Sequence, residues 1–258
     1  MDYQTIGLAV DAGVARLTLD RPAVMNALNT QMRAEITHAL RNLDASARVL
    51  VLTGAGRAFC SGQDLGDTGN ANATDLERVL RDEYVPMLLA LRDLPVPSIA
   101  AVNGAAAGAG ANLALACDVV IASEAAHFTQ AFTRIGLIPD AGGTWTLPRQ
   151  VGSARAMGAM LFADRISARQ AAEWGMIYEA APEADFEERC QARAAQLAQG
   201  PTETYRQLRE AMRASPENGF EAQLALEARL QGVCGRSRDF KEGVVAFIEK
   251  RAPRFEGR

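Results

Sequence analysis

Residues 95–112 read PVPSIAAVNGAAAGAGAN, and this stretch decides the fold class of the 258-residue chain. Its first part, SIAAV at 98–102, is a short apolar run typical of a strand covered on both faces. The glycines and alanines that follow predict a tight passage from that strand into a helix. Small residues at such a junction let a ligand approach unpaired main-chain N–H groups. Close packing of two elements would use the same residues, so the stretch alone fits both interpretations.

Two further apolar runs, RVLVLTG at 48–54 and DVVIAS at 118–123, accompany this strand along the chain. Helix-like segments alternate with them, which predicts parallel strands joined by crossovers and an α/β fold. Ahead of them, residues 5–20 predict a hairpin that turns at Asp11-Ala12-Gly13. A polar loop is expected from 66 to 74, followed by a helix around 75–92.

The remaining helices are predicted from apolar spacing. One begins near residue 30, capped by Asn29 or Thr30. After Pro148 nearly every segment has helical periodicity, so the last third of the chain is expected to be mostly helical. Its apolar stripes fit packing on the α/β body and packing against other subunits equally well.

Composition excludes several classes of function. The chain is 48% hydrophobic and 22% charged with a net charge of −4, which is typical of a globular protein and lacks the basic surface that nucleic acid requires. We find no run of ~20 apolar residues and no signal peptide, and so expect a cytoplasmic protein without a membrane partner. The cysteines are widely spaced, which predicts reduced thiols and no metal site.

Two more glycine-rich junctions accompany the first. They are AFCSGQDL at 58–65, directly after a predicted strand, and GLIPDAGGT at 136–144. Two such junctions lying side by side could direct two main-chain N–H donors at one developing oxyanion.

These segments, in this order, resemble the crotonase (enoyl-CoA hydratase/isomerase) superfamily. The resemblance also includes NALN at 26–29 and EGVVAFIEKRAPRF at 242–255, so it covers essentially the whole chain. It implies a crotonase-type spiral of ββα repeats over residues 1–195, which would hold the CoA site and the active site. It further implies a helical C-terminal trimerisation region over 196–258, and thus a homotrimer or a dimer of trimers.

The resemblance also implies the ligand. An acyl-CoA substrate would place its thioester oxygen between the main-chain N–H groups of Gln63 and Ala109, with CoA as part of the substrate and no separate cofactor. Trp145 would wall the acyl pocket, although core packing explains it equally well. Phe247 and Lys250 of a neighbouring subunit would approach the 3′-phosphate, or else belong to a solvated end of the chain. The other implied binding residues are Ala23, Met25, Ala27, Ser61, Gly62, Asp64, Leu65, Gly108 and Gly110.

Departures from the family pattern bear on the reaction. Hydratases of the family carry two glutamates at the positions of Asn112 and Phe132. Adding water to a double bond requires a group that activates it and a proton source, so their replacement argues against hydration. Asp140 remains as the carboxylate near the expected centre, where it would act as an isomerase acid/base. A helix N-cap is the alternative role for Asp140.

The segments GQDL, GLIPDAGGTWTLPR and ISARQAAEWGMI look like the branch of the family that converts 1,2-epoxyphenylacetyl-CoA to oxepin-CoA in phenylacetate degradation. The prediction is therefore an acyl-CoA isomerase with an oxyanion hole and one aspartate. Three alternatives stay open: a Δ3,Δ2-enoyl-CoA isomerase on aliphatic chains, a dehalogenase with Asp140 as nucleophile, and a CoA-binding relative without activity.

Overall fold

A computed structural model describes residues 2–66 and 75–258 of the chain. The first two strands, β1 (Ile6–Asp11) and β2 (Val14–Leu19), pair antiparallel. Ala12 and Gly13 join them with φ angles of 47° and 81°, the left-handed pair that matches the twist of a two-residue hairpin. The predicted hairpin is confirmed.

The larger sheet has the strand order β1-β2-β3-β5-β7-β10. After β2, its strands are β3 (Val49–Gly54), β5 (Ser98–Val102), β7 (Val119–Ser123) and the edge strand β10 (Glu179–Ala181). From β2 onward all neighbours are parallel, and every residue of β3 is buried. The parallel strands predicted from the three apolar runs are confirmed.

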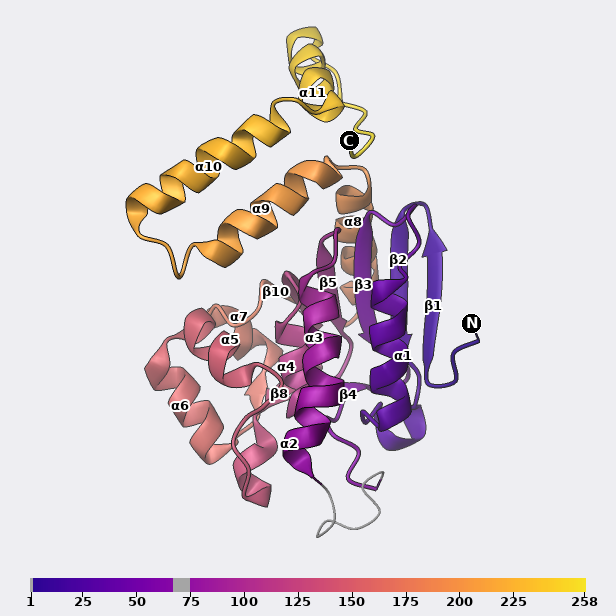
Figure 1. Ribbon diagram of the computed structural model, residues 1–258. Helices are drawn as coiled ribbons and strands as arrows, with labels where there is room; N and C mark the ends of the chain where they lie inside the picture. Colours follow the sequence, from indigo (N-terminus) through magenta and orange to yellow (C-terminus); the bar gives the residue numbers. More distant parts are fainter. Residues whose placement is uncertain (1, 67–74) are drawn as a thin grey trace.

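The smaller sheet has the order β4-β6-β8-β9, and its strands β4 and β8 lie below those of the larger sheet in the view of Figure 1. Its strands are β4 (Ala58–Cys60), β6 (Ala105–Ala107), β8 (His127–Thr129) and the antiparallel β9 (Ile166–Ser167). In each of the pairs β3–β4, β5–β6 and β7–β8, the first strand belongs to the larger sheet and the second to the smaller sheet. A helical segment follows each pair. This repetition is the expected ββα spiral.

The helical segments before β7 include those that adjoin the candidate loops around Gln63 and Ala109. They are η1 (Pro22–Val24), α1 (Thr30–Arg41), α2 (Leu76–Val79), η3 (Leu80–Tyr84), α3 (Val85–Arg92) and α4 (Ala109–Leu115). Asn29 caps α1 by accepting a hydrogen bond from the Met32 N–H at 2.9 Å. The helix predicted over 75–92 is present, but η3 is a π-helical turn within it. The predicted loop 66–74 lies outside the described residues apart from Gly66.

The rest of the chain is mostly helical, as expected. Its helices are η4 (Ala131–Ile135), α5 (Gly143–Val151), α6 (Ser153–Phe162), α7 (Ala168–Glu173), α8 (Phe186–Ala198), α9 (Thr202–Ala214), α10 (Phe220–Cys234) and α11 (Arg238–Glu249). Helix α8 packs Phe186 and Cys190 on one face of the larger sheet, and the main core fills the opposite face.

Helices α9, α10 and α11 extend from the top of the body in Figure 1, at the opposite end from α2 and α6. The expected boundary at 195/196 falls in the last turn of α8. Within residues 2–66 and 75–258, none of the helices combines the length and the apolar character that crossing a membrane requires.

Candidate active site

Two loops from distant parts of the sequence run side by side and bring seven of the predicted binding residues together. The Leu28 N–H donates to the Gly62 carbonyl at 2.7 Å, and the Ser61 N–H donates to the Met25 carbonyl at 3.0 Å. The Arg21 guanidinium donates to the Ala27 carbonyl and to the Asp64 carboxylate. Ala23 and Leu65 are exposed on the same pair of loops.

Gln63 occupies the centre of this loop pair. It forms a parallel bridge with Leu28, in which Leu28 bonds to the flanking residues Gly62 and Asp64. The main-chain N–H of Gln63 therefore points away from Leu28. Among the described residues it has no hydrogen-bond acceptor, so it is available to a ligand.

The beginning of α4 lies against this loop. A Cβ added to Gly62 would come within 3.4 Å of the Ala109 nitrogen, and one added to Gly110 would lie 2.3 Å from the Cys60 carbonyl oxygen. Gly108 turns the chain here with a φ of 52°, and its N–H donates to the Thr129 carbonyl. Ala109 begins the helix, where N–H groups lack intrahelical partners. The predicted pair of N–H groups thus comes from two adjoining loops.

Asp140 lies in the turn that precedes α5. Its main-chain carbonyl accepts the Gly143 N–H at 2.9 Å, but its side chain does not cap the helix. The N-cap residue is Gly142, without a side-chain cap. The Asp140 Oδ1 atom is buried and has no hydrogen-bond partner within the described structure. The N-cap interpretation of Asp140 is therefore wrong.

Burial raises the pKa of Asp140 from 3.8 to about 6. Desolvation disfavours the carboxylate, and the only opposing contribution comes from its own main-chain N–H. A carboxylate with a pKa close to neutral is suited to both accept and return a proton. A shift of this kind, caused by desolvation and without a neighbouring opposite charge, is characteristic of functional sites.

The positions that carry glutamates in hydratases of the family have other roles in this chain. Asn112 is buried, and its Nδ2 donates to the Asp140 carbonyl at 2.8 Å while its Oδ1 accepts from Gln130 Nε2 at 2.8 Å. Phe132 is buried, and its ring would lie 3.7 Å from a Cβ added to Gly108. Asn112 thus holds the turn that carries Asp140, and neither residue supplies an acid or a base.

The sequence reasoning missed Arg33 and Tyr84, which both contact Gln63. The Tyr84 hydroxyl donates to Gln63 Oε1 at 2.5 Å, and Arg33 Nη1 donates to the same oxygen at 2.9 Å. Burial chiefly raises the pKa of Tyr84, with a smaller contribution from the Asp140 charge, which indicates that Tyr84 and Asp140 share one region. The three contacting residues are far apart in sequence, so no local pattern connects them.

The remaining predicted residues lie further out. Trp145 on α5 is 44% exposed and stacks under the Arg149 guanidinium, whose central carbon is 4.3 Å from the ring centroid, so the core-packing interpretation is wrong. Phe247 is 85% exposed on α11, and Lys250 ends that helix. Since α11 is remote from α4 in Figure 1, the chain does not bring Phe247 and Lys250 to its own Gln63 loop. Their contact with CoA of a neighbouring subunit stays a prediction.

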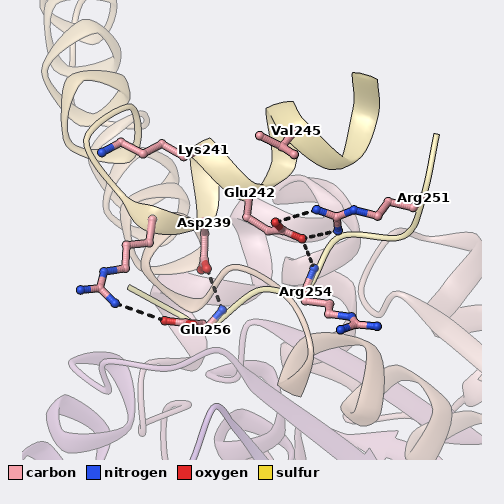
Figure 2. A pocket seen from close by; sticks show the side chains of 8 residues that line it. Asp239, Lys241, Glu242, Val245, Arg251, Arg254 and Glu256 are labelled. Atoms are coloured by element: carbon pink, nitrogen blue, oxygen red, sulfur yellow. Dashed lines mark hydrogen bonds and ion pairs between the residues drawn. The ribbon is translucent and has the colours of Figure 1, made fainter. Parts of the chain in front are cut away.

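Figure 2 shows a pocket between α11 and the C-terminal tail. It is lined by Arg238, Asp239, Lys241, Glu242, Val245, Arg251, Arg254 and Glu256. Glu242 accepts from the Arg251 guanidinium at 2.6 Å and from the Arg254 N–H at 2.8 Å. The carboxylates and guanidinium groups largely pair with one another, and the pocket contains none of the predicted acyl-CoA residues.

Comparison with known proteins points to one family. The family described as enoyl-CoA hydratase/isomerase matches residues 9–258. The "Probable enoyl-CoA hydratase" of Rhodobacter capsulatus is 61% identical over the full length of both chains. The "1,2-epoxyphenylacetyl-CoA isomerase" of Escherichia coli is 45% identical, covering 96% of this chain and 97% of that protein. A crystal structure of enoyl-CoA hydratase from Bacillus anthracis has a TM-score of 0.91 at 33% identity and covers 99% and 100% of the two chains.

Proposed function

Since this chain belongs to the enoyl-CoA hydratase/isomerase family, we propose that it is an acyl-CoA isomerase with Asp140 as the acid/base. The observation that carries this proposal is the half-buried Asp140 side chain, whose Oδ1 atom is buried without a hydrogen-bond partner in the described structure and whose pKa is raised. The substrate that we assign is 1,2-epoxyphenylacetyl-CoA, with oxepin-CoA as the product. The similarity to the isomerase from Escherichia coli supports this choice.

In the proposed reaction, the main-chain N–H groups of Gln63 and Ala109 bind the thioester oxygen. Negative charge that develops on this oxygen is stabilised by donors already in place, so little reorganisation is needed during the reaction. Asp140 takes a proton from one carbon of the acyl group and returns it to another. The atoms of substrate and product are the same, and CoA is part of the substrate, so no separate cofactor is proposed.

Hydration is the reaction that the site disfavours. A hydratase must activate a water molecule and supply a proton, and the side chains of Asn112 and Phe132 do neither. Asn112 is moreover engaged with Gln130 and with the Asp140 carbonyl. We further propose a cytoplasmic homotrimer or dimer of trimers, in which Phe247 and Lys250 approach the CoA of a neighbouring subunit.

The test is a product analysis by liquid chromatography, ultraviolet absorbance and mass spectrometry with four substrates: 1,2-epoxyphenylacetyl-CoA, a 3-enoyl-CoA, a 2-enoyl-CoA and a halogenated acyl-CoA. Isomerisation leaves the mass unchanged, whereas hydration adds one water. We expect isomerisation of the ring epoxide, and faster conversion of the 3-enoyl-CoA would instead assign the aliphatic reaction. Water addition to the 2-enoyl-CoA as the main activity would contradict the proposal, as would halide release from a halogenated acyl-CoA.

The Asp140→Asn variant tests the catalytic role. The loss of a general acid/base is expected to lower kcat by about 10²–10⁴-fold, while the circular dichroism spectrum stays that of the parent. Asp164→Asn is the matched control, because Asp164 is exposed. Activity of Asp140→Asn near that of the control would contradict the assignment.

A further inference from the structure

Arg33 and Tyr84 form a clamp on the Gln63 side chain, outside the residues that the proposed function uses. We propose that this clamp is a positioning device: it fixes the loop so that the Gln63 main-chain N–H faces the thioester oxygen. The inference rests on the proposed function, because that function assigns the Gln63 N–H to the oxyanion. It adds two positioning residues that no comparison assigns.

The clamp converges on a single atom. Gln63 Oε1 accepts from the Tyr84 hydroxyl at 2.5 Å and from Arg33 Nη1 at 2.9 Å. A carbonyl oxygen has two lone pairs, so both are used and the amide has one preferred orientation. Because the side chain and the main-chain N–H belong to the same residue, a fixed side chain limits the rotation of the peptide.

Arg33 links both sides of the loop pair. Its Nη1 also donates to the Leu28 carbonyl at 2.5 Å, and Leu28 is the bridge partner of Gln63. The Arg33 side chain is 1% exposed and forms an ion pair with Glu83 at 2.6 Å. A guanidinium that is buried and multiply bonded is held rigidly, so it can transmit the position of α1 to the loop.

The π-helical turn η3 supplies the other half of the clamp. Glu83 and Tyr84 are its last two residues, and they contact Arg33 and Gln63 respectively. The Arg33 guanidinium also lies 4.9 Å from the centroid of the Tyr84 ring. A π-turn adds a residue to the helical repeat and is often found at functional sites. Here it places two consecutive side chains on one buried cluster.

A displacement of the Gln63 main-chain N–H is expected to reduce the stabilisation of the transition state much more than the stability of the fold. A displacement of about 1 Å in a positioned group can cost about 10²-fold in rate. Removing the Tyr84 hydroxyl or the Gln63 side-chain amide is therefore expected to lower kcat and the polarisation of the thioester. Substrate affinity is expected to change little.

The experiment uses Tyr84→Phe, Gln63→Met and the double variant, with Tyr3→Phe as the control. Tyr3 also loses a hydroxyl hydrogen bond in its variant, the one to His38 at 3.0 Å, but contacts no site residue. The probe is 4-dimethylaminocinnamoyl-CoA, whose absorbance moves to longer wavelength when its thioester carbonyl is polarised. We expect Tyr84→Phe and Gln63→Met each to reduce this shift by about half and kcat by about tenfold, with KM within about twofold of the parent.

The double variant is expected to match the more impaired single variant, because both substitutions remove the same contact. Additive losses, or a full spectral shift in Tyr84→Phe, would overturn the clamp. If Tyr84→Phe fails to fold, Gln63→Met alone decides, since it leaves Tyr84 in place.

Hydrogen exchange of the Leu28 and Asp64 amides, which donate to the Gly62 and Leu28 carbonyls on either side of Gln63, separates the clamp from the proposed function. Measured in the free protein, it needs no thioester, and we expect faster exchange in Tyr84→Phe than in Tyr3→Phe. Unchanged exchange would overturn the clamp while leaving the isomerase proposal intact. A parent protein that produces no spectral shift with the probe would instead contradict the oxyanion assignment of Gln63, and the inferred positioning role with it.

Discussion

Partial burial disfavours the charged form of Asp140, and this makes its protonation state measurable through activity. A base must be ionised in the free enzyme, and burial raises the pKa of Asp140 to about 6. We therefore expect kcat/KM to rise with pH up to about pH 6 and to be level above it. The profile is measured with saturating and limiting acyl-CoA, and kcat/KM that is already level well below pH 5 would contradict a base with this pKa.

The same pKa predicts how stability depends on pH. Because the pKa of Asp140 is higher in the folded state than its ordinary value of 3.8, the folded state binds the proton more tightly, and stability falls as pH rises from about 4 to about 6. The cost above pH 6 is about 3 kcal/mol, at 1.36 kcal/mol per pKa unit. Asp140→Asn lacks this cost, so urea unfolding is expected to show a more stable variant at pH 8 and equal stabilities near pH 4. Equal stabilities of Asp140→Asn and the parent protein at both pH values would contradict a raised pKa of Asp140.

Asn112 offers a test of how the Asp140 turn is held. Asn112→Asp keeps the size of the side chain but places an oxygen against the Asp140 carbonyl, where the amide now donates at 2.8 Å. Losing a buried bond in this way is expected to cost about 1–3 kcal/mol. The control is Asn42→Asp, because Asn42 is exposed and donates to the His38 carbonyl at the same distance. Urea unfolding compares the two, and similar losses would mean that Asn112 does not hold the turn.

At the scale of elements, the close approach of β4 and α4 decides whether the two N–H donors adjoin. A Cβ on Gly110 would lie 2.3 Å from the Cys60 carbonyl oxygen, so Gly110→Ala must push α4 away from the strand. Overpacking of this kind is expected to cost about 1–3 kcal/mol and to lower kcat. Gly158→Ala is the matched control, since a Cβ on Gly158 in α6 would meet nothing within 4 Å. Gly158→Ala should stabilise the protein by up to about 1 kcal/mol. Similar effects of Gly110→Ala and Gly158→Ala in thermal unfolding and activity would contradict the close approach of β4 and α4.

Elements with a strong local signal were predictable from the sequence. The apolar run of β3, the hairpin turn at Ala12-Gly13 and the Asn29 cap each depend on residues close together in the chain. The π-turn η3 was not predictable, because nothing in residues 80–84 distinguishes a wider turn from an α-helical one. Its geometry accompanies contacts with Arg33 and Gln63, which are tertiary and have no sequence spacing of their own.

At the scale of the whole molecule, the family motifs identified Gln63, Ala109 and Asp140 as site candidates, and the fold brings the loops of the first two together. Residue types alone did not decide between a cap and a free carboxylate at Asp140, because both occur before a glycine-rich helix start. The structure decides it through the missing side-chain bond. Helix α11 differs in this respect: its own chain leaves Phe247 exposed, so the predicted contact of Phe247 with CoA requires a neighbouring subunit.

One arginine joins the C-terminal tail, on which α11 packs, to the body of the protein. Arg48 precedes β3, and its guanidinium donates to the Gly200 carbonyl, to Thr202 Oγ1 at 2.9 Å and to the Phe255 carbonyl at 3.1 Å. The tail beyond Phe255 returns to α11, where the buried Asp239 carboxylate accepts the Glu256 and Gly257 N–H groups. Arg48 thus connects the larger sheet, the start of α9 and the tail that holds α11.

Replacing Arg48 therefore tests whether α11 contributes to CoA binding. Arg48→Ala is expected to speed tryptic cleavage of the tail and to raise KM for the acyl-CoA by about tenfold, the equivalent of ~1.4 kcal/mol of lost contact, while kcat changes little because Asp140 is carried by another part of the fold. Arg16→Ala is the control, since its ion pair with Glu187 is exposed and contributes about 0–1 kcal/mol. Faster cleavage of the tail with an unchanged KM would show that Phe247 and Lys250 do not contact CoA, because releasing the helix that carries them would then have left binding intact.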